Sequence, residues 1–419
     1  MAGAARDAGR QVARVGLLAL LCSCAKIEAP PGGPPDFTPP VIISITPDSG
    51  AIIEDFGEDF EIRFDEVIAE ASAGGLENLV LVAPRPAETT VNWKRSRVTV
   101  RPKGGWRRGT IYHVQVRPGF ADLRNNRLDS AITIVFSTGP AIPATQLTGT
   151  IIDWEAGRTA PRALVEAVLL PDSLIYFTQA DSSGDFQLAA VPAGRYQLFA
   201  TIDGNSNRQR DLREGFDSVT VDLDSTLSHV FWTFAHDTTG PRITSLLQLD
   251  SLTVQVEFSQ MLQPSAPADS AVQVFALPDT VPVTVAAVWP QGIYDSVRTV
   301  EAAIADSLRS LAAAEAAAAD SLLADSLRAD SARVDSTAVP LQLTADTAGA
   351  AGPDSVAADT SRVTALLAER PKLSATWFVR LEVPLAAGAR YLVVTHATNL
   401  SEATLRSVSL LVTQAPDST

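Results

Sequence analysis

The chain has 419 residues, of which 46% are hydrophobic and 19% charged, and its formal net charge at pH 7 is −15. This length is large for one domain and suits two to four. Its only cysteines, Cys22 and Cys24, lie near the N-terminus, so the composition excludes a disulfide-stapled fold and thiol chemistry in the rest of the chain.

The N-terminal segment has the pattern of a signal peptide. Three arginines precede an apolar run over residues 15–21, which is much shorter than the roughly 20 residues of a membrane-spanning helix. The run ends in Leu21-Cys22-Ser23-Cys24, which resembles the lipobox of bacterial lipoproteins. The resemblance implies cleavage of residues 1–23 and a diacylglycerol on the Cys24 sulfur. An ordinary secretory signal is the alternative.

Sorting of the anchored chain is implied by the same resemblance. Ala25, rather than aspartate, follows Cys24, and this implies an outer-membrane lipid anchor that faces the periplasm or the exterior. Two acyl chains give stable attachment, so the membrane is the first predicted partner.

The next two segments differ sharply in composition. Residues 24–40 are rich in proline and glycine and predict a stiff linker. Residues 41–140 predict one antiparallel sandwich, because apolar side chains alternate with polar ones in short runs near residues 61–64, 97–101, 112–116 and 132–136.

A different unit is predicted over residues 145–236. Two turns, at residues 181–186 and 191–196, read Asp-Ser-Ser-Gly-Asp-Phe and Val-Pro-Ala-Gly-Arg-Tyr. Glycine accepts the positive φ of a tight turn, and the aromatic residue after it fills a core between two small sheets. These turns resemble those of the transthyretin-like, carboxypeptidase-regulatory fold.

Residues 237–419 repeat features of the first sandwich. Asp36-x-Thr38-x-Pro40 matches Asp237-x-Thr239-x-Pro241, and the strand ending in Phe64 matches the strand ending in Phe258. Phe64 and Tyr112 are 48 positions apart, whereas Phe258 and Tyr391 are 133 apart, a difference of 85. We therefore predict a second Ig-like domain with a low-complexity insertion over residues 292–371.

The insertion is rich in alanine, aspartate, serine and leucine. Its Asp-Ser pairs recur every five residues from Asp320, a period that builds no coherent face on a helix. We expect a solvated helix over about 297–334 and disorder in the remainder. Pairing with a partner helix is the alternative.

Taken together, the lipobox, the linker and the two domain types resemble bacterial Ig-like domain-containing lipoproteins, in which an S-layer-type bacterial Ig-like domain accompanies a transthyretin-like domain. The resemblance implies an all-β chain of tandem Ig-like and transthyretin-like β-sandwiches with a helical or disordered insertion. It implies an envelope protein and supplies no catalytic residues. The long insertion departs from the family pattern.

The loop over residues 203–214 is a candidate calcium site. Its oxygen side chains follow the spacing of a twelve-residue calcium loop, with a backbone carbonyl at position 7. The candidate ligands are Asp203, Asn205, Asn207, Gln209, Asp211 and Glu214. Arg208 occupies the position where an EF-hand has glycine. The alternative is a hairpin whose side chains cap their own backbone, so the predicted cofactor is either none or a structural calcium ion.

A basic stretch is the second candidate site. Residues 85–127 contain eleven lysines or arginines and two acids. Strand alternation places Arg95, Arg97 and Arg101 on one face, with Trp93 and Trp106 nearby. The candidate anion-binding residues are Lys94, Arg95, Arg97, Arg101, Lys103, Arg107 and Arg108. Lipid phosphate or an acidic envelope glycan, rather than nucleic acid, would be the ligand; a solvated sheet face is the alternative.

Catalysis has little support in the sequence. The four histidines are scattered, and the spacings of a metalloprotease, a nucleophile elbow or a phosphate loop do not occur. We therefore predict a non-enzymatic envelope protein that binds another envelope component or acts as a spacer. The alternative is a carbohydrate-binding accessory protein, which would need an aromatic platform built from Trp93, Trp106 or Trp154.

Overall fold

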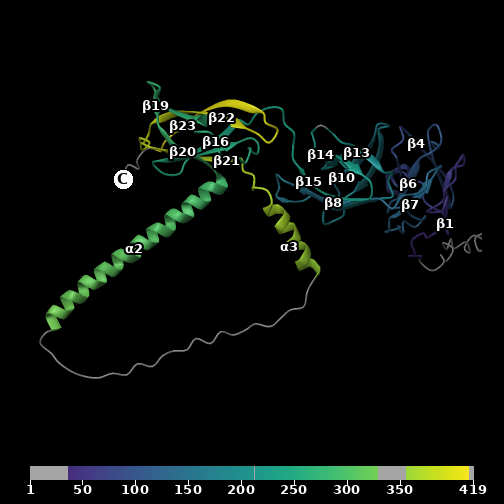
Figure 1. The fold of residues 1–419 in the computed structure, drawn as a ribbon, viewed down its shortest axis with the longest axis horizontal. Helices are drawn as coiled ribbons and strands as arrows, with labels where there is room; N and C mark the ends of the chain where they lie inside the picture. The colour runs from purple at the N-terminus through teal and green to yellow at the C-terminus, as the bar shows by residue number, and fades with distance from the viewer. Residues whose placement is uncertain (1–35, 212, 329–354, 415–419) are drawn as a thin grey trace, which may run out of the picture. The chain divides into compact units, whose positions relative to one another are not determined.

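The computed structural model describes residues 36–211, 213–328 and 355–414 (Figure 1). The predicted signal peptide, Cys24 and the linker up to residue 35 lie outside this part of the chain. The described chain is mainly β-strand, and it divides into two compact units, Met1–Ala141 and Ile142–Thr419. Within the described residues, no helix combines the length and apolar character needed to cross a membrane.

The first domain is an antiparallel sandwich. One sheet has the order β1-β2-β5-β4 and the other β3-β6-β7. Two short 3-10 helices, η1 and η2, precede β3. The elements are β1 (Ile42–Thr46), β2 (Phe60–Phe64), η1 (Ser72–Gly74), η2 (Leu76–Asn78), β3 (Val80–Ala83), β4 (Thr89–Lys94), β5 (Arg97–Pro102), β6 (Ile111–Val116) and β7 (Ile132–Ser137).

Strand alternation explains how this sandwich closes. Phe60, Ile62 and Phe64 of β2 are buried between the sheets, whereas Glu61 and Arg63 face outward. Aromatic rings fill the core: Trp106 lies 5.2 Å from the Phe136 ring, and only 9% of its surface is exposed.

The middle domain, β8 to β15, contains both predicted turns, and the aromatic residue after each turn is buried in its core. Its sheets have the orders β12-β8-β15, with β9 beside β8, and β11-β10-β13-β14. Gly184 has a φ of +86°, and Phe186 after it is buried. Tyr196 after the second turn is also buried, and its hydroxyl donates to the Pro192 carbonyl at 2.6 Å. The strands are β8 (Gln146–Asp153), β9 (Arg158–Thr159), β10 (Leu164–Leu170), β11 (Leu174–Gln179), β12 (Asp185–Ala189), β13 (Gly194–Thr201), β14 (Phe216–Leu223) and β15 (Thr226–Thr233).

The third domain, β16 to β23, repeats the topology of the first. Its sheets have the orders β16-β17-β21-β20 and β19-β18-β22-β23. The elements are β16 (Ile243–Gln248), β17 (Thr253–Phe258), η3 (Asp269–Ala271), β18 (Val272–Ala276), β19 (Val281–Val283), β20 (Val285–Pro290), β21 (Thr376–Leu381), β22 (Arg390–Thr398) and β23 (Thr404–Val412).

The first and third domains also agree in fine detail. The first strand pair has the same register shift in each, beside Ile42 opposite Phe64 and beside Ile243 opposite Phe258. Tyr112 accepts a hydrogen bond from the backbone N–H five residues earlier, at 2.6 Å, and Tyr391 does the same at 2.8 Å. Such coincidences of register and capping indicate a duplicated domain.

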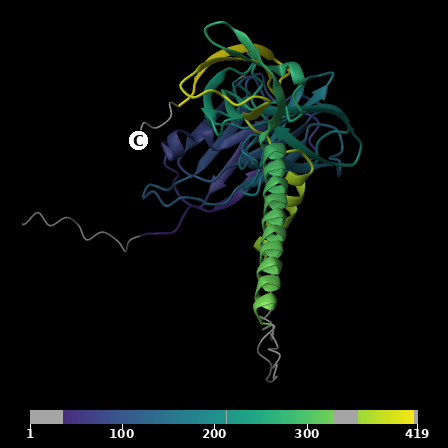
Figure 2. The ribbon, with the colours of Figure 1, turned by 90° about the vertical axis from the view of Figure 1, so that its left-hand side faces the viewer.

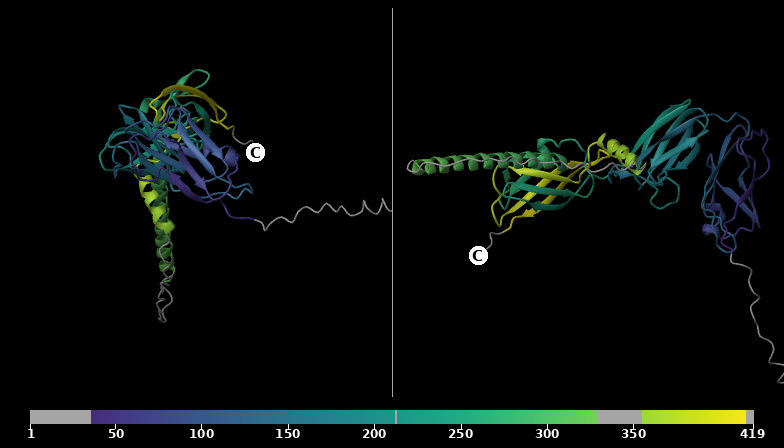
Figure 3. Two further views of the ribbon diagram at one scale, coloured as in Figure 1. Left: turned by 90° about the vertical axis from the view of Figure 1, so that its right-hand side faces the viewer. Right: turned by 90° about the horizontal axis from the view of Figure 1, so that it is seen from below.

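The insertion occupies one hairpin of the third domain. Strands β4 and β5 are joined by two residues, whereas β20 and β21, in the corresponding positions, are joined through α2 (Gln291–Arg328) and α3 (Ser355–Ala368). Figure 2 shows α2 as one unbroken helix, and Figure 3 gives two further views of both helices. Tyr294, near the start of α2, stacks on Phe378 of β21, with ring centroids 3.8 Å apart.

Two expectations for the insertion need correction. Disorder was expected after about residue 334, but residues 355–368 form α3. A coherent helix face was not expected either, yet Val300, Ile304, Leu308 and Leu311 recur at helical spacing on α2, each more than half exposed. The expectation relied on the Asp-Ser pairs at 306, 320, 325, 330 and 335, whose five-residue period is regular only from Asp320 onward.

Candidate functional site

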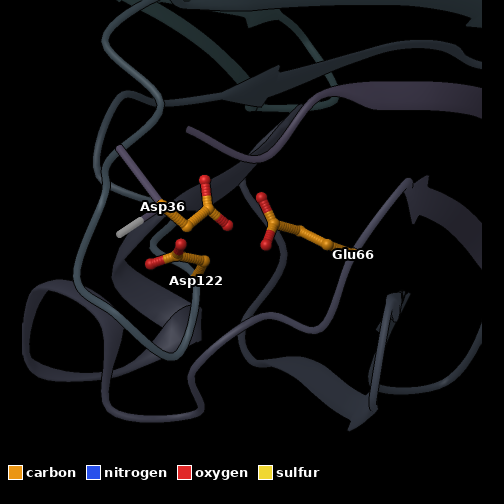
Figure 4. Close-up of side chains that lie close together, drawn as sticks. All are labelled: Asp36, Glu66 and Asp122. Atoms are coloured by element: carbon orange, nitrogen blue, oxygen red, sulfur yellow. The ribbon is translucent and has the colours of Figure 1, made fainter. Parts of the chain in front are cut away.

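Three carboxylates meet where the chain enters the first domain. Asp36, Glu66 and Asp122 each offer an oxygen, and these oxygens lie within 4.8 Å of one another (Figure 4). Asp36 precedes β1, Glu66 follows β2, and Asp122 follows β6. We call these three residues the entry triad.

Hydrogen bonds hold two members of the entry triad in place. Asp122 is buried, and its Oδ1 accepts the backbone N–H groups of Arg124 and Asn126 at 2.8 Å each. Asp36 is exposed, and its Oδ1 accepts the Thr38 N–H at 3.0 Å. This backbone hydrogen bond holds the pKa of Asp36 below its usual value.

Glu66 is the member of the entry triad that resists ionisation. It is half-buried, and desolvation together with the nearby charge of Asp122 raises the pKa of its carboxyl. Raising the pKa means that the folded domain disfavours a third negative charge at this place.

The third domain has an equivalent of the entry triad in which two of the three carboxylates are replaced by amides. Asp237, Gln260 and Asn399 occupy the positions of Asp36, Glu66 and Asp122. Gln260 Nε2 donates to Asp237 Oδ2 at 2.5 Å, and Asn399 Nδ2 donates to Gln260 Oε1 at 3.0 Å. In the third domain the amide N–H groups donate to the neighbouring oxygens of the same corner, whereas the entry triad brings together three carboxylates, which only accept hydrogen bonds when ionised.

Carboxylate oxygens in such an arrangement are ligands that a hard cation such as Ca²⁺ takes, so the entry triad could hold one. Sequence reasoning missed it because its members are 30 and 56 positions apart. The available signal was the internal repeat, in which Glu66 and Asp122 align with amides.

The predicted calcium loop lies between β13 and β14, and its side chains converge. Asp203 accepts the N–H groups of Asn207 and Arg208, both at 3.0 Å. Asn205 and Asn207 donate side-chain N–H groups to Asp211 Oδ2 at 2.7 and 3.0 Å. In this arrangement the loop caps its own backbone, as the alternative interpretation expects.

The conformations of two arginines of the loop nevertheless suit a cation. Arg208, at the position of the EF-hand glycine, has a φ of +59°, so the backbone makes a left-handed turn there without glycine. Arg210 turns away from the loop and places its guanidinium 3.8 Å from the centre of the Phe199 ring. Glu214 Oε1 closes the loop by accepting the Gly204 N–H at 2.9 Å.

We expect millimolar calcium to raise the unfolding temperature of the middle domain. A site with a Kd of about 10⁻³ M would add about 1.4 kcal/mol to the free energy of unfolding at tenfold higher calcium. Asp203→Asn should abolish the gain, which calorimetry on the full chain can measure. The same titration in a Glu66→Gln background removes any contribution of the entry triad. An unchanged unfolding temperature would identify the loop as a self-capped hairpin.

Part of the basic stretch, Arg97 and Arg101 of β5, lies on the outer face of the sheet β1-β2-β5-β4, and the fold brings acids to it. Glu61 contacts Arg63, two residues later on β2, at 2.8 Å, and it contacts Arg97 at 3.3 Å because β2 pairs with β5. Three further ion pairs involve the stretch. Arg101 pairs with Asp59 at 3.1 Å, Lys103 with Glu88 at 2.6 Å, and Arg108 with Asp55 at 2.6 Å.

Two further details modify the predicted anion site. Arg95 does not share a strand face with Arg97 and Arg101, because it lies in the turn between β4 and β5 with a φ of +56°. Asn92, Lys94 and Thr99 line a depression of about 480 Å³ with Glu58 and three further charged residues, Asp59, Glu61 and Arg97. Its walls carry both signs of charge.

Arg107 lies in the loop before β6, and its side chain or backbone also interacts with another group of the protein.

The tryptophans proposed for a glycan platform do not form one. Trp106 is in the core of the first domain. Trp93 of β4 is partly buried against the same core and also lines the charged depression. Trp154 lies 6.2 Å from Trp232, but the two rings are inclined at 74°. A stacked sugar needs a flat, open ring face, and this trio does not supply a shared one.

Comparison with known families agrees with the architecture. The bacterial Ig-like domain family matches residues 36–138, and the carboxypeptidase regulatory-like domain family matches residues 146–230. The chain thus carries a bacterial Ig-like domain followed by a transthyretin-like domain, and this confirms the predicted domain types and all-β fold. Both are non-catalytic module types.

No curated protein matched the chain. Among solved structures, a "putative carbohydrate binding protein" of Bacteroides uniformis is 10% identical, with 64% of this chain and 99% of that chain covered and a TM-score of 0.17. The major pilin subunit BcpA of Bacillus cereus is 11% identical, with coverages of 44% and 67% and a TM-score of 0.17. The Bacillus anthracis TIE protein is 10% identical, with coverages of 64% and 51% and a TM-score of 0.16.

Proposed function

We propose that this protein is a non-catalytic spacer of the cell envelope, held to the outer membrane by a lipid on Cys24. Its three sandwiches would carry the α2 arm away from the lipid. Two non-catalytic domain types in the same chain support this proposal, as does the duplicated Ig-like topology of the third domain.

The observation that carries the proposal is the ion pairing of the basic stretch. Four of its seven candidate anion-binding residues, Arg97, Arg101, Lys103 and Arg108, are paired with acids of the same domain. An anion would compete with those carboxylates, and their negative charge lowers the net positive potential that would attract it. Pairing of this kind favours a spacer over a docking surface for lipid phosphate.

Vesicle sedimentation tests this proposal. The non-acylated chain from residue 25 onward should stay in the supernatant with phosphatidylcholine vesicles and equally with vesicles that contain phosphatidylglycerol. The acylated chain should sediment with both. Glu61→Gln releases Arg63 and Arg97 and serves as a positive control, since it should increase sedimentation with the anionic vesicles at low salt. Strong binding of the unmodified non-acylated chain to anionic vesicles would contradict the spacer role.

The carbohydrate-binding alternative has its own readout. A panel of envelope glycans should show no saturable binding to the non-acylated chain. Saturable binding that is lost in Trp154→Ala, but kept in Trp289→Ala of the third domain, would replace the spacer role with glycan recognition.

A further inference from the structure

The C-terminal limb of the insertion contacts the middle domain rather than solvent. Arg362 of α3 places Nη1 2.9 Å from Asp185 Oδ2, and its Nη2 donates to Thr150 Oγ1 at 2.8 Å. Asp185 begins β12 and Thr150 is its direct partner in β8. One guanidinium therefore binds across two neighbouring strands.

A second arginine binds beyond the end of the helix. The guanidinium of Arg370 lies 4.9 Å from the ring centres of both Trp154 and Trp232. Trp154 Nε1 also donates to the Pro371 carbonyl at 3.2 Å. The inclined pair of tryptophans, which offers no flat platform for a sugar, instead forms a corner that receives a planar cation.

Apolar contact accompanies these polar ones. Leu367 and Leu373 line a cavity of about 350 Å³ together with Trp154 and Gly157 of the middle domain. Leu373 is buried. Because β21 of the third domain begins at Thr376, the chain passes directly from this contact into the third domain.

We propose that residues 361–373, here called the strap, are an intramolecular docking segment that fastens the insertion to the middle domain. The middle and third domains are then joined twice. The first connection is the direct linker, in which Glu155 accepts the Ala235 N–H at 2.6 Å and the His236 ring stacks between Phe216 and Phe234. The strap is the second.

Helix stability gives the proposal a measurable consequence. An isolated helix of 14 residues, the length of α3, is marginal in water, so its amide hydrogens should be protected mainly through docking. Hydrogen–deuterium exchange on the full mature chain, read by mass spectrometry, measures this protection for peptides within residues 355–372. Arg370→Ala should speed their exchange about tenfold, on the scale of a partly desolvated cation–π contact.

The variants separate docking from helix propensity. Arg370 lies outside α3, so its replacement leaves the helix sequence intact. Arg362→Gln removes the contacts with β8 and β12 and keeps a good helix former; it should act in the same direction. Arg309→Gln is the control, because Arg309 pairs with Asp306 on α2, at 2.9 Å, and it should leave exchange in the strap unchanged.

Two outcomes would overturn the proposal. Equal exchange of these peptides in the wild type and in Arg370→Ala would show that the strap does not depend on the tryptophan corner. Protection that falls on dilution of the wild-type chain would show docking onto a second copy instead of the same chain.

Discussion

Replacing Cys24 with serine should release the protein from the membrane fraction. Serine has no sulfur to receive the diacylglycerol, and without two acyl chains the predicted attachment has no other source. The expected effect is close to all-or-none in a fractionation of the producing cells. Mass spectrometry of the mature N-terminus should find an acylated Cys24 in the wild type.

The lipobox contains its own control. Cys22→Ser changes the neighbouring cysteine, which the predicted cleavage discards, and it should leave both the membrane attachment and the mature N-terminus unchanged. A Cys24→Ser protein that stays in the membrane fraction would contradict the lipid anchor. The proposed outer-membrane location would then lose its basis.

Exchanging one residue between the two Ig-like domains should change their stabilities in opposite directions. Glu66→Gln gives the first domain the amide that Gln260 provides in the third, where Nε2 donates to Asp237 Oδ2. A neutral side chain with a hydrogen bond to Asp36 then replaces a carboxylate whose charge is opposed by desolvation and by the charges of Asp122, Asp65 and Asp36. We expect a gain of about 1 kcal/mol in the free energy of unfolding of the first domain at pH 7.

The reciprocal change, Gln260→Glu, should destabilise the third domain by about 2 kcal/mol. It removes the donor to Asp237 and leaves Asn399 as the remaining amide of that corner. Calorimetry with a chelator present measures both variants free of any cation. Equal shifts of the same sign would show that the two corners are not equivalent.

The pH dependence identifies Glu66 as the cause. Its pKa in the folded domain is raised above 4.5, so the folded state binds more protons than the unfolded state between the two pKa values. Ionisation of Glu66 therefore lowers stability as pH rises through this window. The advantage of Glu66→Gln should be largest at pH 7 and should shrink as pH falls through the raised pKa. An advantage that does not change with pH would assign the effect to another group.

Local pattern was sufficient for much of the fold. The two tight turns before Phe186 and Tyr196 were visible because a positive-φ glycine and its aromatic neighbour lie within six residues of sequence. The repeat was visible because strand motifs keep their order. The length difference between the copies located the insertion, since extra residues in a hairpin leave its two strands paired.

Charge counting along the chain was less informative. The basic stretch looked unpaired because Asp55, Asp59 and Glu61 lie earlier in the sequence. The pairing of β2 with β5 brings Asp59 and Glu61 to Arg101 and Arg97, and Asp55 pairs with Arg108. Arg95 was placed on a strand face because alternation was extended through a turn. A helical period was missed in α2 because the Asp-Ser repeat was taken to represent the whole segment.

The sequence by itself determined the strand pattern, the domain types, the turns and the place of the insertion, because each depends on neighbours within a few residues. Only the tertiary structure decided which distant side chains meet. It assembled the entry triad, paired four cations of the basic stretch with acids, and placed Arg370 on Trp154 and Trp232. Such contacts join segments tens to hundreds of residues apart, and their partners are fixed by strand order and register rather than by any local pattern.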